Sequence, residues 1–122
     1  MPKKILVVDD NEDIRTSVSQ ILEVHGYEVI GAENGIECLK HLERTIPDLV
    51  ILDIMMPGMS GWDVAARIKA HEKWRVVPIV FFTAKGDEMS MGLGGLASEN
   101  YIVKPFEVEE LLECVDRILQ SP

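Results

Sequence analysis

Residues 49–61 read Leu-Val-Ile-Leu-Asp-Ile-Met-Met-Pro-Gly-Met-Ser-Gly, and they carry the clearest local signals for the fold class. Its first four residues form a continuous apolar run, as expected of a strand that is covered on both faces. The run ends at Asp53. A helix is expected to begin at Ser60 or Gly61, with Asp63 in its first turn, where a carboxylate is favourable. The stretch therefore predicts a buried strand with a carboxylate at its tip, followed by a loop and a helix.

Four further apolar runs occur along the chain and are also expected to be strands. Segments of roughly 20 to 30 residues separate successive runs, which is the room that a helical crossover needs. Five strand-helix units joined by right-handed crossovers predict an α/β fold with a parallel sheet and helices on both of its faces. The four runs are Ile5 to Val8, Tyr27 to Ile30, Ile79 to Phe82, and Tyr101 to Val103.

Capping residues indicate where the connecting helices begin and end. Asn11 is expected to cap the first helix, which Gly26 stops. Asn34 and Glu37 form a capping-box-like start for the second helix. Glu107 occupies the cap position of the last helix, where a shorter Asp, Ser or Asn is more common.

The segment from Gly86 to Ala97 is the exception among the expected helices. Four of its residues are glycines, and each interior glycine costs about 1 kcal/mol of helix propensity relative to alanine. We therefore expect a short or mobile element in this segment.

Length and composition exclude several classes of protein. The chain has 122 residues and a net charge of −9, which predicts one globular domain over residues 1–122 with a surface that repels nucleic acids and anionic membranes. The longest apolar stretch, Val76 to Phe82, is far shorter than the roughly 20 residues of a membrane-spanning helix. No signal peptide is expected. Cys38 and Cys114, which form no C-x-x-C pair, are expected to fill the core of a cytoplasmic protein as reduced thiols.

Polar residues end four of the five expected strands. In an open α/β sheet, ligands bind outside the carboxyl ends of the strands. Asp9 and Asp10 end the first strand, and Asp53, Thr83 and Lys104 end the third, fourth and fifth. The second strand leads into Gly31 and Ala32, which carry no reactive group. If these strands lie side by side, three carboxylates, a hydroxyl and an ammonium group converge on one edge of the sheet.

The three carboxylates need neutralising charge. At an effective dielectric constant near 20, two carboxylates about 4 Å apart repel each other by roughly 4 kcal/mol. Lys104 supplies one positive charge and a divalent cation would supply two. Oxygen ligands without histidine or cysteine favour a hard cation, and Mg²⁺ commonly takes one or two carboxylates together with a phosphate oxygen. The pattern predicts a site for Mg²⁺ and a phosphoryl group.

Phosphoryl transfer also needs an in-line nucleophile and donors to the phosphoryl oxygens. A carboxylate can be that nucleophile. Asp53 is the natural candidate because it stands alone at a strand tip, whereas Asp9 and Asp10 are adjacent and better placed to hold a metal. Thr83 and Lys104 can contact the phosphoryl oxygens.

Four segments together resemble the receiver domain of two-component response regulators, in particular the stand-alone, chemotaxis-regulator-like type. The likeness covers essentially the whole chain, and its motifs occur in the right order at the ends of the expected strands. It implies a flavodoxin-like, doubly wound sheet with five parallel strands in the order 2-1-3-4-5. The segments are Val7 to Asn11, Leu52 to Gly61, Thr83 with Ala84, and Lys104 to Phe106.

The resemblance also implies a role for each residue of the acidic cluster. Asp53 would accept phosphate from a sensor histidine kinase or a histidine phosphotransfer protein. Asp9, Asp10 and Asp53 would hold Mg²⁺ together with the backbone carbonyl of Met55. The protein would then be a phosphoacceptor module that assists its own phosphorylation and dephosphorylation, rather than an enzyme with a separate substrate.

The family further implies a conformational switch. Thr83 would move to the phosphoryl group, Tyr101 would turn inward behind it, and Lys104 would contact the phosphoryl group. The resemblance also implies a cis peptide bond between Lys104 and Pro105. A downstream protein would bind in a phosphorylation-dependent manner. The simpler interpretation of Tyr101 alone is that it is a core residue.

Two interpretations stay open beside this one. A magnesium-dependent phosphatase of the haloacid-dehalogenase type also uses an aspartate nucleophile, but it requires a D-x-D pair and a cap that this chain does not contain. The chain is either a free-standing relay protein or the receiver part of a longer regulator or hybrid kinase.

The chain also departs from the family pattern, because residues 97–100 are Ala-Ser-Glu-Asn instead of the usual Gly-Ala-Asp-Asp.

Overall fold

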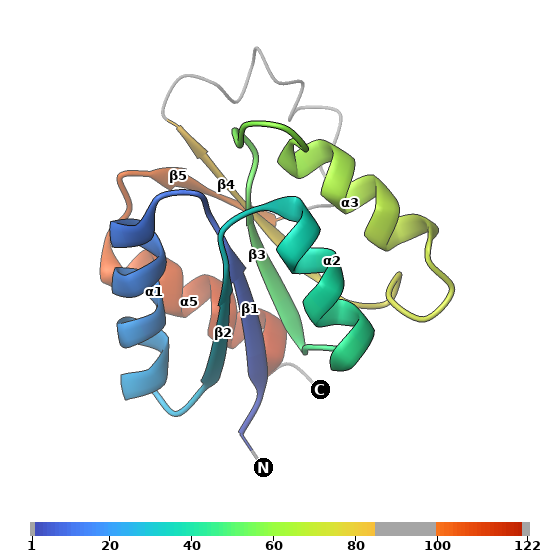
Figure 1. Cartoon of the computed structure of the whole chain (residues 1–122). Coiled ribbons are helices and arrows are strands. Elements are labelled where there is room, and N and C mark those ends of the chain that lie inside the picture. Colours follow the sequence, from blue (N-terminus) through green and yellow to red (C-terminus); the bar gives the residue numbers. More distant parts are fainter. Residues whose placement is uncertain (1, 85–99, 121–122) are drawn as a thin grey trace.

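The computed structural model describes residues 2–84 and 100–120. Five strands form one parallel sheet in the order β2-β1-β3-β4-β5 (Figure 1). This architecture confirms the predicted α/β fold and its strand order. The strands are β1 (Lys4–Val8), β2 (Glu28–Ala32), β3 (Leu49–Asp53), β4 (Ile79–Ala84) and β5 (Asn100–Lys104), and the helices are α1 (Glu12–Val24), α2 (Gly35–Arg44), α3 (Gly61–Ala70) and α5 (Val108–Leu119).

Helices cover both faces of the sheet, with α2 and α3 on one face and α1 and α5 on the other (Figure 1). Alternate residues of each strand therefore enter different clusters. In β3, Val50 and Leu52 pack toward α2 and α3, whereas Leu49 and Ile51 pack toward α1 and α5. Burial on both faces explains why the strand sequences are continuously apolar.

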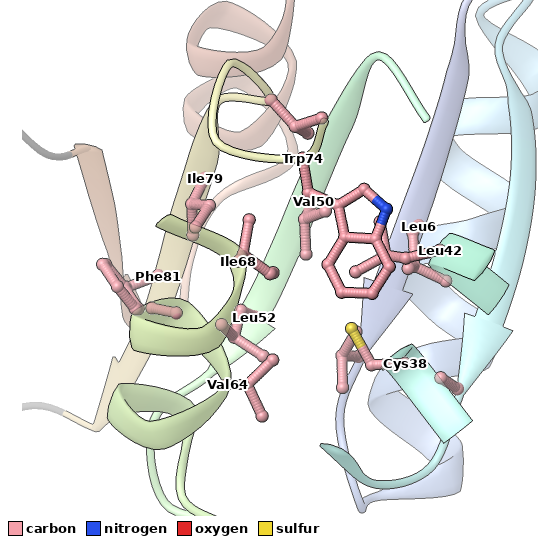
Figure 2. Packing of buried hydrophobic residues seen from close by; sticks show 14 of the residues in the cluster. Leu6, Cys38, Leu42, Val50, Leu52, Val64, Ile68, Trp74, Ile79 and Phe81 are labelled. Atoms are coloured by element: carbon pink, nitrogen blue, oxygen red, sulfur yellow. The ribbon is translucent and has the colours of Figure 1, made fainter. Parts of the chain in front are cut away.

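The two predicted core cysteines and Trp74 lie in these clusters. Cys38 and Cys114 are both buried and are not joined in a disulfide, as predicted. Trp74, which follows α3, is only 8% exposed. Figure 2 shows its indole ring lying beside Cys38 and Leu42 of α2. Trp74 thus closes the cluster under α2 and α3.

The second strand lies one to two residues later than predicted. Tyr27 precedes β2, and its backbone N–H donates to the carbonyl of Leu22. Gly31 and Ala32 belong to the strand because they pair with the end of β1. The Tyr27 ring is nevertheless buried in the cluster under α1 and α5, and its hydroxyl is hydrogen bonded to Asp116 in α5.

The predicted helix starts are present with one correction. The side chains of Asn11, Asn34 and Ser60 accept backbone hydrogen bonds at the starts of α1, α2 and α3. The carboxylate of Glu37 accepts from Glu33 instead of from the cap residue Asn34, so this box is only half formed. Glu107 is the N-cap residue of α5, as predicted, and its backbone N–H donates to the side chain of Glu110.

The short or mobile element predicted over residues 86–97, and the residues Ala97, Ser98 and Glu99, fall outside the described residues, and these predictions stay predictions. Asn100 is described and begins β5. Among the helices of the described ranges, none is long and apolar enough to cross a membrane.

Candidate functional site

Parallel pairing brings the predicted polar residues to one edge of the sheet. Asp9 follows β1, whereas Asp53, Thr83 and Lys104 lie at or near the carboxyl ends of β3, β4 and β5. One carboxylate oxygen each from Asp9, Asp10 and Asp53 lies within 4.8 Å of the others. The structure therefore brings the three predicted carboxylates and the lysine together, and Thr83 is buried on the strand between them.

Asp9 is held rigidly within this cluster. It is fully buried, and its Oδ1 accepts a hydrogen bond of 2.9 Å from the backbone N–H of Asn11. Its Oδ2 accepts one of 2.8 Å from Nζ of Lys104. A charge-assisted bond of this length in a buried setting is strong, so Asp9 and Lys104 form the fixed part of the site.

Asp53 is less fully paired than Asp9. Its side chain lies 3.5 Å from Nζ of Lys104 and accepts a 3.3 Å hydrogen bond from the backbone N–H of Met55. Asp53 is 5% exposed. Lys104 therefore favours Asp9, and the three carboxylates with one ammonium group leave a formal charge of −2 when all are ionised.

This environment changes the acidity of Asp53. The pKa of Asp53 rises from 3.8 to about 7. Burial is the largest cause of this rise, and the negative charge of Asp9 is the next. Lys104 and the N–H of Met55 act in the opposite direction but do not cancel these effects. An added positive charge beside Asp53 would therefore favour its ionised form.

The raised pKa predicts a stability that depends on pH in the metal-free protein. Between pH 4 and 7 the folded state holds a proton that the unfolded state has released, so the free energy of unfolding falls as the pH rises. Three pH units correspond to an upper limit of about 4 kcal/mol. Urea denaturation in EDTA across this range checks the slope. In Asp53→Asn the corresponding part of the slope should be missing, and an unchanged slope would contradict the assignment.

The donor set fits a hard divalent cation. It contains only oxygen ligands, its formal charge is −2, and the carboxylate oxygens are close enough to share one ion. Asp10 is exposed and lies on the solvent side of the cluster, whereas Asp9 and Asp53 are buried. Such an arrangement could hold an ion with its remaining positions open to water or to a phosphoryl oxygen.

Replacing Asp10 with alanine separates its metal role from its effect on folding. Removal of one carboxylate should weaken Mg²⁺ binding by at least about tenfold, because one of few ligands is lost. It should also raise the metal-free unfolding free energy by up to about 1 kcal/mol by relieving repulsion. Calorimetric Mg²⁺ titration and urea denaturation check the two effects. A clear loss of metal-free stability would contradict the electrostatic account.

The loop after Asp53 is held by a close approach of α3. The backbone N–H of Gly61 donates to the carbonyl of Ile54 over 2.8 Å. A Cβ atom at position 61 would lie 2.3 Å from the carbonyl oxygen of Asp53. Only glycine permits this contact, so Gly61 fixes the loop that carries Met55 beside the carboxylate.

Sequence reasoning missed Arg15. Its guanidinium Nη1 donates a 2.8 Å hydrogen bond to the backbone carbonyl of Asp9, between the sheet edge and α1. One signal was available, because Arg15 lies near the first turn of α1, where the helix dipole disfavours a cation. The hydrogen bond to the Asp9 carbonyl explains why a cation occurs at this position.

The remaining predicted residues occupy varied surroundings. The peptide between Lys104 and Pro105 is cis, as the family resemblance implied. Tyr101 is 47% exposed, so the interpretation of this residue as a core residue was wrong. Its ring can therefore change its environment without leaving a packed core. Neither His25, His41 nor His71 joins the acidic cluster.

Comparison with known proteins gives a consistent result. Residues 5–116 match the family described as the response regulator receiver domain. The chain is 41% identical to the alkaline phosphatase synthesis transcriptional regulatory protein PhoP of Bacillus subtilis over 98% of its own length and 50% of that protein. It is 36% identical to the polar-differentiation response regulator DivK of Brucella anthropi over 98% of both chains. The chain thus spans about half of one relative and nearly all of the other.

Solved structures show the same likeness. A putative response regulator from Chloroflexus aurantiacus superposes with a TM-score of 0.91 at 34% identity, over 99% of this chain and 100% of that one. The chemotaxis response regulator CheY4 of Vibrio cholerae superposes with a TM-score of 0.88 at 32% identity, over 98% and 100% of the two chains. The similarity extends over the whole sheet and the edge that carries the acidic cluster.

Proposed function

The chain belongs to the response regulator receiver domain family, the signalling modules of two-component systems, and we propose that Asp53 is its phosphorylation site. One observation carries the assignment: Asp53 is the carboxylate of the cluster that is neither fixed by a short bond to Lys104 nor exposed on its rim. Its oxygen is therefore free of the short bond that fixes Asp9, and it lies beside Lys104, which can contact phosphoryl oxygens. Nothing in the comparisons supports the phosphatase alternative.

The proposed reaction is a transfer between two side chains. An ionised Asp53 oxygen attacks the phosphorus of a phosphohistidine, a new P–O bond forms, and the P–N bond breaks. The departing electron pair stays on the imidazole nitrogen of the donor, which then takes up a proton from water. Lys104, whose Nζ is 3.5 Å from the Asp53 carboxylate, contacts the phosphoryl oxygens with Thr83. The chain thereby assists its own phosphorylation and, with water as the acceptor, its dephosphorylation.

Mg²⁺ is the cofactor of this proposal. Asp9, Asp10, Asp53 and the backbone carbonyl of Met55 would hold it. When bound, it supplies positive charge that screens the carboxylates and the phosphoryl oxygens from one another. The all-oxygen cluster with a formal charge of −2 supports this assignment.

Thr83 and Tyr101 form the proposed switch. Phe81 pairs with Tyr101 and Thr83 pairs with Val103 in the β4–β5 ladder. Residues two apart on a strand share a face, so Thr83 and Tyr101 lie on the same side of the sheet. Movement of the Thr83 hydroxyl toward a phosphoryl oxygen would open space that the half-exposed Tyr101 ring can enter.

The partners and location follow from this chemistry. We place residues 1–122 in one cytoplasmic domain that receives phosphate from a sensor histidine kinase or a histidine phosphotransfer protein. A downstream protein would bind the phosphorylated form. With a net charge of −9, the receiver surface itself is not proposed to bind nucleic acid or membranes.

Chemical trapping tests the phosphorylation site directly. The protein is incubated with phosphoramidate and MgCl₂, and borohydride then reduces any aspartyl phosphate to homoserine. Peptide mass spectrometry is expected to find homoserine at position 53. Unreacted protein treated with borohydride is the control. Homoserine at Asp9 or Asp10 in place of Asp53 would overturn the assignment.

A further inference from the structure

A surface groove lies between the C-terminal ends of α2 and α3, away from the acidic cluster. Two hollows of about 360 and 370 Å³ adjoin there and share Glu43, His71 and Trp74. We call them together the α2–α3 groove and define it by Glu43, Arg44, Arg67, His71, Lys73 and Trp74. The groove lies at the end of the helices that is opposite to the strand tips carrying Asp53 (Figure 1).

The charge around this groove is opposite to that of the rest of the chain. Residues 40–46 and 66–75 contain six of the 12 lysines and arginines but only two of the 21 acidic residues. These two segments therefore carry a net charge of +4, and the remainder of the chain carries −13. A protein with so strong an asymmetry attracts anions to one end.

The dipoles of α2 and α3 offset only part of this positive charge. Each helix C-terminus is equivalent to roughly half a negative charge, so the two ends offset about one of the four excess positive charges. In addition, the described part of the chain shows no ion pair that involves Arg44, Arg67 or Lys73. Arg44, Arg67 and Lys73, which line the groove, are thus available to a ligand.

The floor of the groove is rigid and partly apolar. The rings of His71 and Trp74 stack with their centroids 3.7 Å apart and an interplanar angle of 7°. Nδ1 of His71 accepts a 3.1 Å hydrogen bond from the backbone N–H of Lys73, which leaves Nε2 as the donor of the neutral ring. Ile46 lines the first hollow and is 45% exposed.

From this combination we propose that the α2–α3 groove binds a short acidic peptide segment of a partner protein. Two or more carboxylates would meet Arg44, Arg67 and Lys73, and one aliphatic side chain would pack against Ile46. A peptide is favoured over a nucleic acid because a longer polyanion would extend beyond the groove toward the remainder of the chain, whose formal charge is −13.

Fluorescence of Trp74 offers a local test. The chain has two tryptophans, so a Trp62→Phe background leaves Trp74 as the only tryptophan, and excitation is set at a wavelength that tyrosine does not absorb. Titration with acetyl-Asp-Glu-Leu-Asp-Asp-Leu-amide is expected to change its emission saturably, and the effect should weaken as salt is raised. The peptide acetyl-Asn-Gln-Leu-Asn-Asn-Leu-amide, which has the same length and shape without charge, should cause no saturable change. Absence of binding by the acidic peptide would overturn the proposal.

Charge variants locate the binding. Arg67→Glu is expected to weaken acidic-peptide binding at least tenfold, and Arg67→Gln should weaken it less. The matched control is Lys40→Glu, which makes the same charge change on α2 at an exposed residue that does not line the groove. It should alter the affinity no more than about twofold. Equal losses in Arg67→Glu and Lys40→Glu would show attraction by the whole charge pole and would overturn a specific groove.

A nucleic-acid probe separates the remaining alternative. A single-stranded thymidine oligonucleotide is titrated under the same conditions and is expected to bind at least tenfold more weakly than the acidic peptide. Equal or tighter binding that Arg67→Glu abolishes would overturn the peptide assignment. Circular dichroism of each variant confirms that the fold is retained.

Discussion

Replacing Asp53 with asparagine is expected to reduce acid-labile phosphate incorporation by at least about 100-fold, because an amide is a far weaker nucleophile than a carboxylate. The fold should be retained, since asparagine has nearly the same shape and can still accept the hydrogen bond from the N–H of Met55. Radiolabelled phosphodonor with MgCl₂, followed by acid and base treatment, measures the incorporation. Circular dichroism checks the fold.

The matched control for this variant is Asp13→Asn. Asp13 is an exposed residue of α1 outside the acidic cluster, so the same chemical change should leave phosphorylation within about twofold of the original. Full incorporation by Asp53→Asn would transfer the nucleophilic role to another residue. Loss in both variants would indicate an effect on folding or on the donor instead.

Replacing Lys104 with methionine is expected to lower the metal-free unfolding free energy by about 3 kcal/mol at pH 8. Asp9 is fully buried and receives its short charge-assisted bond from Lys104. Removing the cation leaves this charge uncompensated in the interior, which is the costly way to break a buried pair. Urea denaturation in EDTA measures the loss.

A surface lysine and Mg²⁺ provide the controls for this second prediction. Lys4→Met removes the more exposed ion pair with Glu28 at 3.2 Å and should cost less than about 1 kcal/mol. Addition of MgCl₂ should restore stability to Lys104→Met and should raise the stability of Lys4→Met only as it does that of the original protein. Equal losses in the two variants would contradict the central electrostatic role of Lys104.

The two predictions address different properties of one cluster. Asp53 is the proposed nucleophile because it is incompletely paired. Lys104 stabilises the folded protein because it neutralises the buried charge of Asp9. A protein in which Asp53→Asn is inactive but stable, and Lys104→Met is unstable without metal, would show both parts. The α2–α3 groove is independent of either result, since it lies at the opposite end of α2 and α3.

Local patterns in the sequence were sufficient to predict the fold and the carboxylates and lysine of the site. Apolar runs of strand length, separated by helix-length segments, indicate a parallel sheet because its strands are buried on both faces. The carboxyl ends of parallel strands must share one edge, so Asp9, Asp53 and Lys104 could be placed together before any distance was known. The predicted bounds of β2 were one to two residues too early, because Tyr27 precedes the strand and is nevertheless buried in the cluster under α1 and α5.

Two properties of this protein depend on the tertiary structure: the interaction energies within the acidic cluster, and the gathering of cations at the α2–α3 groove. Packing brings Lys104 closer to Asp9 than to Asp53, and it places Arg15 at the Asp9 carbonyl. Packing also buries Asp53, which raises the pKa of its carboxyl group. The α2–α3 groove likewise joins cations from two segments that are separated in sequence by β3. Periodicity and capping are properties of neighbouring residues, whereas charge interactions and desolvation depend on distances across the folded chain.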